Sequence, residues 1–171
     1  VGGGRYVDDL TRPGMAHAVI VRSPHAHARV LRVDARRALA HPGVLACLTG
    51  ADLAGVPPIP IRHPTKPAHD AYLQPPLASA RVRYVGEPVA VVVATDPASG
   101  VDARELVEVD YEILPALVDP EDAERSGGPL LFPEGNVADS LSTALGDVDA
   151  ALSEAACVVR DGYCATWRAW T

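Results

Sequence analysis

The chain has 171 residues, which fits one globular domain, and 48% of them are hydrophobic, enough to form a core. Its net charge of −7 and its single lysine, Lys66, exclude an extended basic surface for nucleic acid. The 16 prolines favour many short elements over a bundle of long helices. No apolar run approaches the roughly 18 residues of a membrane-spanning helix.

The cysteines Cys47, Cys157 and Cys164 are odd in number and match no metal-binding spacing. A disulfide framework is therefore not expected, and we predict a reducing, cytoplasmic location. The chain starts at Val1 rather than at a methionine and shows no signal-peptide pattern. This start predicts a trimmed chain or a piece of a longer protein.

The first fifty residues predict three short strands joined by turns. These strands are Met15–Val21, Ala28–Val33 and Val44–Thr49. Between the last two, Asp34 is placed to cap a short helix, because its carboxylate can accept free backbone N–H groups. The run His41–Gly43 then ends that helix.

The middle of the chain begins with a proline-rich stretch, residues 57–76, which predicts a long ordered loop, with disorder as the alternative. Two strands follow, Val82–Val85 and Val89–Ala94. The pair Asp96 and Pro97 predicts a helix capped by the aspartate, with the proline in its first turn. Gly100 inside this helix is expected to cost about 1 kcal/mol relative to alanine.

The clearest period-two pattern lies between residues 107 and 113. Apolar side chains alternate there with carboxylates, which predicts a strand with one buried and one wet face. The apolar set is Val107, Val109, Tyr111 and Ile113, and the acidic set is Glu108, Asp110 and Glu112.

The last third predicts a helical turn at Asp119-Pro120, a helix capped by Asp147 and an extended stretch over Val158–Thr166. The apolar face of the second helix comprises Val148, Ala151, Leu152 and Ala155. Short strands and three or four short helices alternate irregularly, which indicates an α+β fold. We predict a single domain over residues 1–171, with 1–4 as a flexible lead and 162–171 as a tail or the start of a next domain.

Candidate chemical groups each have a structural alternative. His25 and His27 share a strand face and could bind a metal, but a third ligand at the right spacing is missing, which favours a structural role. The carboxylates of residues 108–112 could hold a cation, but such rows usually form a solvated strand face. The run Gly2–Gly4 lacks the flanking elements of a nucleotide loop. Cys47 is expected to be buried and inert.

Several motifs together resemble the large subunit of molybdenum hydroxylases, the family of xanthine oxidase, aldehyde oxidase and molybdenum carbon monoxide dehydrogenase. The resemblance extends in order over roughly Arg5 to Asp161. It is carried by Arg5–Asp9, Pro13–Ala18, Arg22–Arg29, Pro42–Val44, Thr49–Leu53, Val82–Ala90, Glu108–Glu112 and Leu114-Pro115. The loop 57–76 and the end Tyr163–Arg168 follow the family less closely.

The resemblance implies the amino-terminal α/β hammerhead domain of such a subunit. In that family the molybdenum–pterin cofactor and the catalytic glutamate belong to later domains, and electrons leave through 2Fe–2S clusters, usually to FAD. We therefore expect this chain to bind no cofactor and to carry no catalytic or metal-binding residue. The expected partners are the cofactor-binding domains and the iron–sulfur and flavin subunits. The substrate cannot be read from this segment.

Two hypotheses follow: a scaffold domain that docks onto the cofactor-binding domains, or a stand-alone binding or assembly protein with the same fold. For the first, the candidate docking surface is the turn Gly86, Glu87 and Pro88 together with the corner formed by Arg22 and His25. An alternative role for the same residues is only to shape tight turns.

Overall fold

A computed structural model describes residues 3–4, 6–60, 66–125, 127–143 and 145–159. The chain divides into two compact units, Val1–Ala138 and Asp139–Thr171, and each is described on its own. The single domain predicted over residues 1–171, with its lead and tail, stays a prediction, since most of those end residues lie outside the described part.

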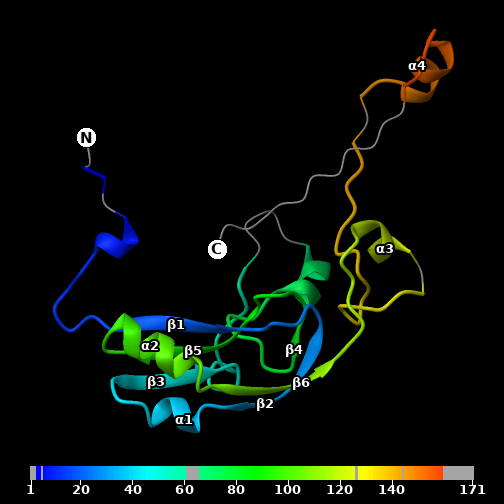
Figure 1. Cartoon of the computed structure of the whole chain (residues 1–171). Coiled ribbons are helices and arrows are strands. Elements are labelled where there is room, and N and C mark those ends of the chain that lie inside the picture. Colours follow the sequence, from blue (N-terminus) through cyan, green and yellow to red (C-terminus); the bar gives the residue numbers. More distant parts are fainter. Residues whose placement is uncertain (1–2, 5, 61–65, 126, 144, 160–171) are drawn as a thin grey trace. The chain divides into compact units, whose positions relative to one another are not determined.

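The first unit contains two antiparallel sheets of three strands each (Figure 1). In sheet A the order is β1-β5-β3, and in sheet B it is β4-β2-β6. The strands of sheet A are β1 (His17–Arg22), β5 (Pro88–Ala94) and β3 (Val44–Thr49). Those of sheet B are β4 (Arg81–Val82), β2 (Ala28–Asp34) and β6 (Glu108–Ile113).

The described residues hold four short α-helices, so the predicted α+β fold is confirmed. They are α1 (Arg36–Leu39), α2 (Pro97–Arg104) and α3 (Pro120–Glu124) in the first unit and α4 (Val148–Glu154) in the second. Two 3-10 turns, η1 (Val7–Asp9) and η2 (Pro67–Tyr72), complete the first unit. The described part of the predicted loop, residues 57–76, contains η2 and an isolated β-bridge between Ile59 and Gln74, so it is ordered there.

Aspartate caps begin three of these helices as predicted, because each carboxylate accepts an otherwise free backbone N–H. Asp96 accepts from the Ser99 N–H at 2.9 Å, and Asp119 and Asp147 cap α3 and α4 in the same way. Asp34 also accepts a backbone N–H, that of Arg36, although the cap position itself is Ala35.

Helix α2 lies against one face of sheet A, in contact with β1 and β5 (Figure 1). Gly100 makes this close approach possible: a Cβ atom there would lie 2.7 Å from Cγ2 of Val19 and 3.5 Å from Cβ of Ala94. The glycine that the sequence marks as a helix weakness is thus the contact point between the helix and the sheet.

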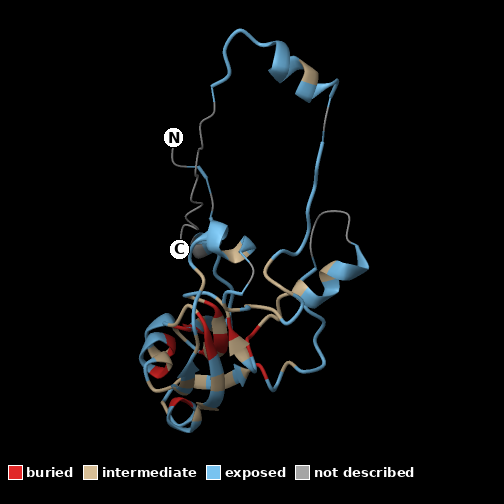
Figure 2. Ribbon diagram, turned by 90° about the vertical axis from the view of Figure 1, so that its right-hand side faces the viewer, coloured by how far each residue is buried: buried red, intermediate tan, exposed pale blue. Residues whose placement is uncertain are grey.

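The core lies between α2, sheet A and the inner face of sheet B (Figure 2). Its buried members include Ala90 and Val92 of β5, Ala103 of α2 and Val82 of β4. From sheet B, Val30, Val33, Val109 and Tyr111 pack against this cluster and remain partly exposed.

Most of the predicted alternation in β6 is confirmed. Val107, Val109 and Tyr111 are partly buried, whereas all three carboxylates are exposed. Ile113 is the exception, because it stands at the end of the strand and is 69% exposed.

Two strands predicted from the sequence differ in the structure. The strand predicted over Val82–Val85 is wrong beyond Val82, because the chain turns there: the Glu87 N–H bonds to the Tyr84 carbonyl, and Gly86 has a φ of 90°. In the second unit, Val158 and Val159 form no strand, and the rest of the stretch Val158–Thr166 lies outside the described residues. The apolar face of α4 is present, with Val148 and Leu152 about half exposed.

Candidate functional site

The structure brings together the two segments predicted to form a docking surface. At the end of sheet A, Arg22 pairs with Pro88 across a bulge. The Arg22 guanidinium donates to the Gly86 carbonyl at 2.9 Å, and the Gly86 N–H donates to the Ser23 carbonyl at 2.8 Å. The Ser23 N–H in turn donates to the Glu87 carbonyl at 2.9 Å. We call these residues the docking corner: Arg22, Ser23, His25, Gly86, Glu87 and Pro88.

Glu87 cannot serve as a surface residue, because it is only 2% exposed. Its carboxylate accepts the backbone N–H of Arg83 and so closes the turn. Burial raises the pKa of Glu87, and the Arg83 N–H and guanidinium charge oppose that rise only in part. Glu87 therefore shapes the turn of the docking corner, whereas the Arg22 side chain is accessible to a partner.

Both histidines have structural partners. The ring of His25 meets the ring of Tyr111 edge-on, with centroids 4.9 Å apart, and the backbone N–H of His25 donates to the Ser23 hydroxyl. His27 is 4% exposed, and its Nδ1 lies 2.7 Å from the Pro115 carbonyl. Since a carbonyl only accepts, Nδ1 carries the proton, and Nε2 is buried without a partner among the described residues. The two side chains do not converge on a metal position.

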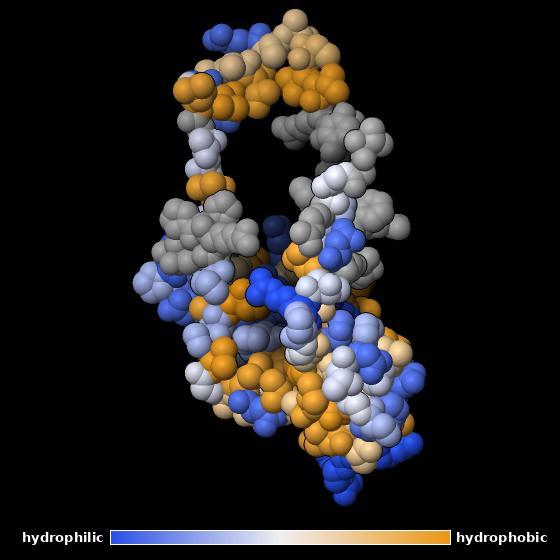
Figure 3. Space-filling model, turned by 90° about the vertical axis from the view of Figure 1, so that its left-hand side faces the viewer, coloured by the Kyte–Doolittle hydropathy of each residue, from blue (hydrophilic) through white to orange (hydrophobic). Residues whose placement is uncertain are grey.

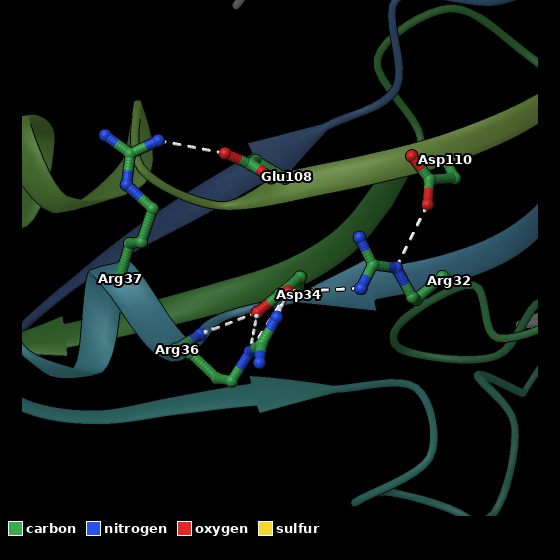
Figure 4. Close-up of polar contacts among 6 residues, drawn as sticks. All are labelled: Arg32, Asp34, Arg36, Arg37, Glu108 and Asp110. Carbon is green, nitrogen blue, oxygen red and sulfur yellow. Dashed lines mark hydrogen bonds and ion pairs between the residues drawn. The ribbon is translucent and has the colours of Figure 1, made fainter.

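The exposed carboxylates of β6 are paired with arginines of β2 and α1, and Figure 4 shows the pairs of Asp110 and Glu108. Arg29 meets Glu112 at 3.0 Å, Arg32 meets Asp110 at 3.0 Å, and Arg37 meets Glu108 at 2.9 Å. All six side chains are about half exposed or more, so each pair contributes little to stability, of the order of 0–1 kcal/mol. The predicted solvated face is confirmed.

Asp34 joins this charged face from the end of β2, between Arg32 and Arg36 (Figure 4). Hydrogen bonds from the Arg36 side chain and backbone lower the pKa of Asp34 far below its usual range. The charged side chains on the outer face of sheet B are thus compensated by partners of opposite charge, which suits contact with water.

A small pocket of about 270 Å³ opens beside the docking corner. The Arg83 guanidinium lies 4.3 Å from the centre of the Phe132 ring, and its Nε donates to the Leu131 carbonyl at 2.9 Å. Partial burial lowers the pKa of Arg83, although the stacked arginine keeps its charge. The pocket is further lined by Tyr72, Gln74, Tyr84 and Glu87.

The thiols show no sign of activation. Cys47 is partly rather than fully buried, and this burial raises the pKa of its thiol, which favours the unreactive form. Cys157 is exposed, and Cys164 lies outside the described residues. Within the part of the chain that the structure describes, His, Cys, Asp and Glu side chains form no group of three that could hold a metal ion. No described helix is long and apolar enough to cross a membrane.

Comparison with known proteins decides the family. The model of the aldehyde oxidase and xanthine dehydrogenase a/b hammerhead domain matches residues 1–115. The chain belongs to this family. The match contains both sheets, α1 and α2, and therefore the docking corner and the charged face of this hammerhead domain.

Two curated relatives are similar to this chain over most of its length. The gamma subunit of the 6-hydroxypseudooxynicotine dehydrogenase complex of Paenarthrobacter nicotinovorans is 39% identical over 167 residues, which is 95% of this chain and 21% of that protein. The carbon monoxide dehydrogenase large chain of Afipia carboxidovorans is 48% identical over 130 residues, or 76% of this chain and 16% of that protein. This chain thus spans about a fifth of the length of these relatives.

Solved structures show the same fold. The Cu,Mo-CO dehydrogenase structure superposes with a TM-score of 0.67 at 45% identity, over 76% of this chain and 16% of that chain. The aldehyde oxidoreductase of Desulfovibrio gigas superposes with a TM-score of 0.68 at 30% identity, over 75% of this chain and 15% of that chain. The resemblance drawn from sequence motifs and the hammerhead fold are therefore both confirmed.

Sequence reasoning missed the pocket and the buried state of Glu87. A glutamate in a Gly-Glu-Pro turn is expected to face water, since carboxylates are almost never fully buried unless they are paired. Phe132 and Leu131 reach the pocket from more than forty residues further along the chain than Arg83. Such distant neighbours give no local signal in the sequence.

Proposed function

We propose that this hammerhead domain is a non-catalytic scaffold that docks onto the cofactor-binding domains of a molybdenum hydroxylase large subunit. The observation that carries the proposal is coverage: the chain matches only 16–21% of the length of two relatives, one of which is the large chain of carbon monoxide dehydrogenase. The other hypothesis, a stand-alone binding or assembly protein, has no structural observation that favours it.

The chemistry of the described residues supports a scaffold role. The side chains that could hold a cofactor form no ligand set: Glu87 is bonded to the Arg83 backbone, the β6 carboxylates are paired with arginines, and the buried Nε2 of His27 stands alone among the described residues. These groups do not fit a molybdenum–pterin group. In the proposed enzyme that cofactor is held by other domains, and 2Fe–2S clusters and FAD by partner subunits or domains.

Elemental analysis tests the non-catalytic part of the proposal. The chain is expressed alone in a host that makes the molybdenum–pterin cofactor, purified, and assayed for molybdenum and iron. We expect less than about a tenth of an atom of either metal per chain. Stoichiometric molybdenum in the purified chain would contradict the proposal.

Assembly tests the scaffold part. The partner is the gamma subunit of 6-hydroxypseudooxynicotine dehydrogenase from which the matched 167 residues have been deleted, called here the truncated gamma subunit. Co-expression with this chain should raise the soluble yield of the truncated gamma subunit. The deleted 167-residue segment, supplied as a separate chain, is the positive control. If the control restores the truncated gamma subunit and this chain does not, the scaffold proposal fails.

A further inference from the structure

We propose that the face of sheet A opposite α2 is the surface through which this domain docks onto the rest of the large subunit. This inference rests on the proposed scaffold function and names its contact surface. The apolar sheet face, as we call it, consists of Ala18 and Ile20 of β1, Val91 and Val93 of β5, and Ala46 and Leu48 of β3.

Strand register places these six residues on one side. In an antiparallel sheet, residues directly opposite one another point to the same face. Ile20 and Leu48 both lie opposite Val91. Ala18 and Ala46 both lie opposite Val93, so the six side chains form two adjacent rows across three strands.

Helix α2 covers the other side of the sheet. Gly100 of α2 faces Val19 and Ala94, which are one position away from Ala18 and Val93. Because successive strand residues alternate between the two faces, the apolar sheet face points away from the helix.

The apolar sheet face is accessible in the described part of the chain. Ile20 is 37% exposed, Leu48 is 36% exposed, and Ala18 is also exposed. Val91 and Val93 are only partly buried, although they belong to the central strand. In Figure 3 hydrophobic residues gather over the part of the chain that contains the sheets.

The contrast with sheet B argues that this face is made to be covered. On sheet B, the outer rows pair Arg29 with Glu112 and Arg32 with Asp110, which suits a surface in contact with water. On sheet A, every outer position of the two rows is apolar. Contiguous apolar patches of this kind mark interaction sites, whereas isolated exposed apolar residues do not.

The occupant is the portion of the large subunit outside the hammerhead domain. In the relative that aligns with 95% of this chain, the match spans 21% of the protein, so most of that chain is available to cover the face. A face without charged groups fits an apolar surface of the same assembly rather than an acidic or basic partner. The accessible Arg22 at the end of β1 lies at the rim of this surface, where polar contacts surround an apolar centre.

Lysine substitutions test the inference, with copurification of the tagged chain and the truncated gamma subunit as the measurement. Ile20→Lys and Leu48→Lys each place a charge on the apolar sheet face at a partly exposed position of an edge strand. Leu31→Lys, at a 63% exposed position of sheet B, is the matched control. Thermal unfolding of the three isolated variants, compared with that of the wild-type chain, is the control for folding.

We expect the wild-type chain and Leu31→Lys to recover the truncated gamma subunit equally, and the two sheet A variants to recover at least tenfold less. Equal recovery by all four chains overturns the inference and leaves the scaffold function intact. Failure of the wild-type chain, when the deleted 167-residue segment succeeds, overturns the scaffold function and the inference with it. A wild-type chain that dimerises alone, and becomes monomeric in both sheet A variants, assigns the face to a second copy and overturns the proposed occupant.

Discussion

Substituting Gly100 by alanine sets two opposed effects against each other. In the interior of a helix, alanine is favoured over glycine by about 1 kcal/mol. Here, however, the new Cβ would lie 2.7 Å from Cγ2 of Val19, closer than real Cβ contacts allow. Val19 is β-branched and held in a strand, so its methyl group cannot easily rotate away. Overpacking of this kind costs roughly 1–3 kcal/mol.

The steric effect is expected to win, so Gly100→Ala should lower the free energy of unfolding by about 1 kcal/mol. Urea denaturation followed by circular dichroism measures this change. The double variant Val19→Ala/Gly100→Ala supplies the internal check. With the valine methyl groups removed, the second substitution should raise stability by up to about 1 kcal/mol relative to Val19→Ala alone. An increase in stability for Gly100→Ala in the wild-type background would refute the packing argument.

Three further predictions concern polar groups. Asp96→Ala removes the cap bond to the Ser99 N–H and should cost about 1 kcal/mol in urea denaturation, whereas Asp96→Asn retains most of it. A double-mutant cycle on Arg32 and Asp110, whose side chains are 55% and 58% exposed, should give a coupling below about 1 kcal/mol that falls further in 1 M salt. The raised pKa of Glu87 means that the folded state binds its proton more tightly, so stability should fall as pH rises from about 4.5 through the folded pKa. Glu87→Gln should remove that fall, and an unchanged pH profile would contradict it.

The helix starts could be predicted because their causes are local. Asp96, Asp119 and Asp147 each act on a backbone N–H two or three residues away. The two faces of β6 could also be assigned, since its carboxylates alternate with apolar residues. Ile113 departs from the pattern because burial at a strand end depends on the neighbouring elements and not on the strand itself.

Which face of sheet A lies against α2 could not be predicted from the sequence in the same way. Strand β5 is a continuous apolar run, so both of its faces look equally suited to a core. Only the position of α2 shows that Ala94 faces the helix while Val91 and Val93 face away. The turn at Gly86 was predicted from its Gly-Glu-Pro sequence, but the burial of Glu87 depends on the distant pairing of β1 with β5.

The mass of the assembled particle tests the central claim most directly. Light scattering on the copurified sample gives the stoichiometry of this chain and the truncated gamma subunit. A docking domain predicts one copy of each in a single particle, with β1 and β3 amides protected from hydrogen exchange relative to the isolated chain. Two separate peaks, each with the mass of a free component, would contradict the account.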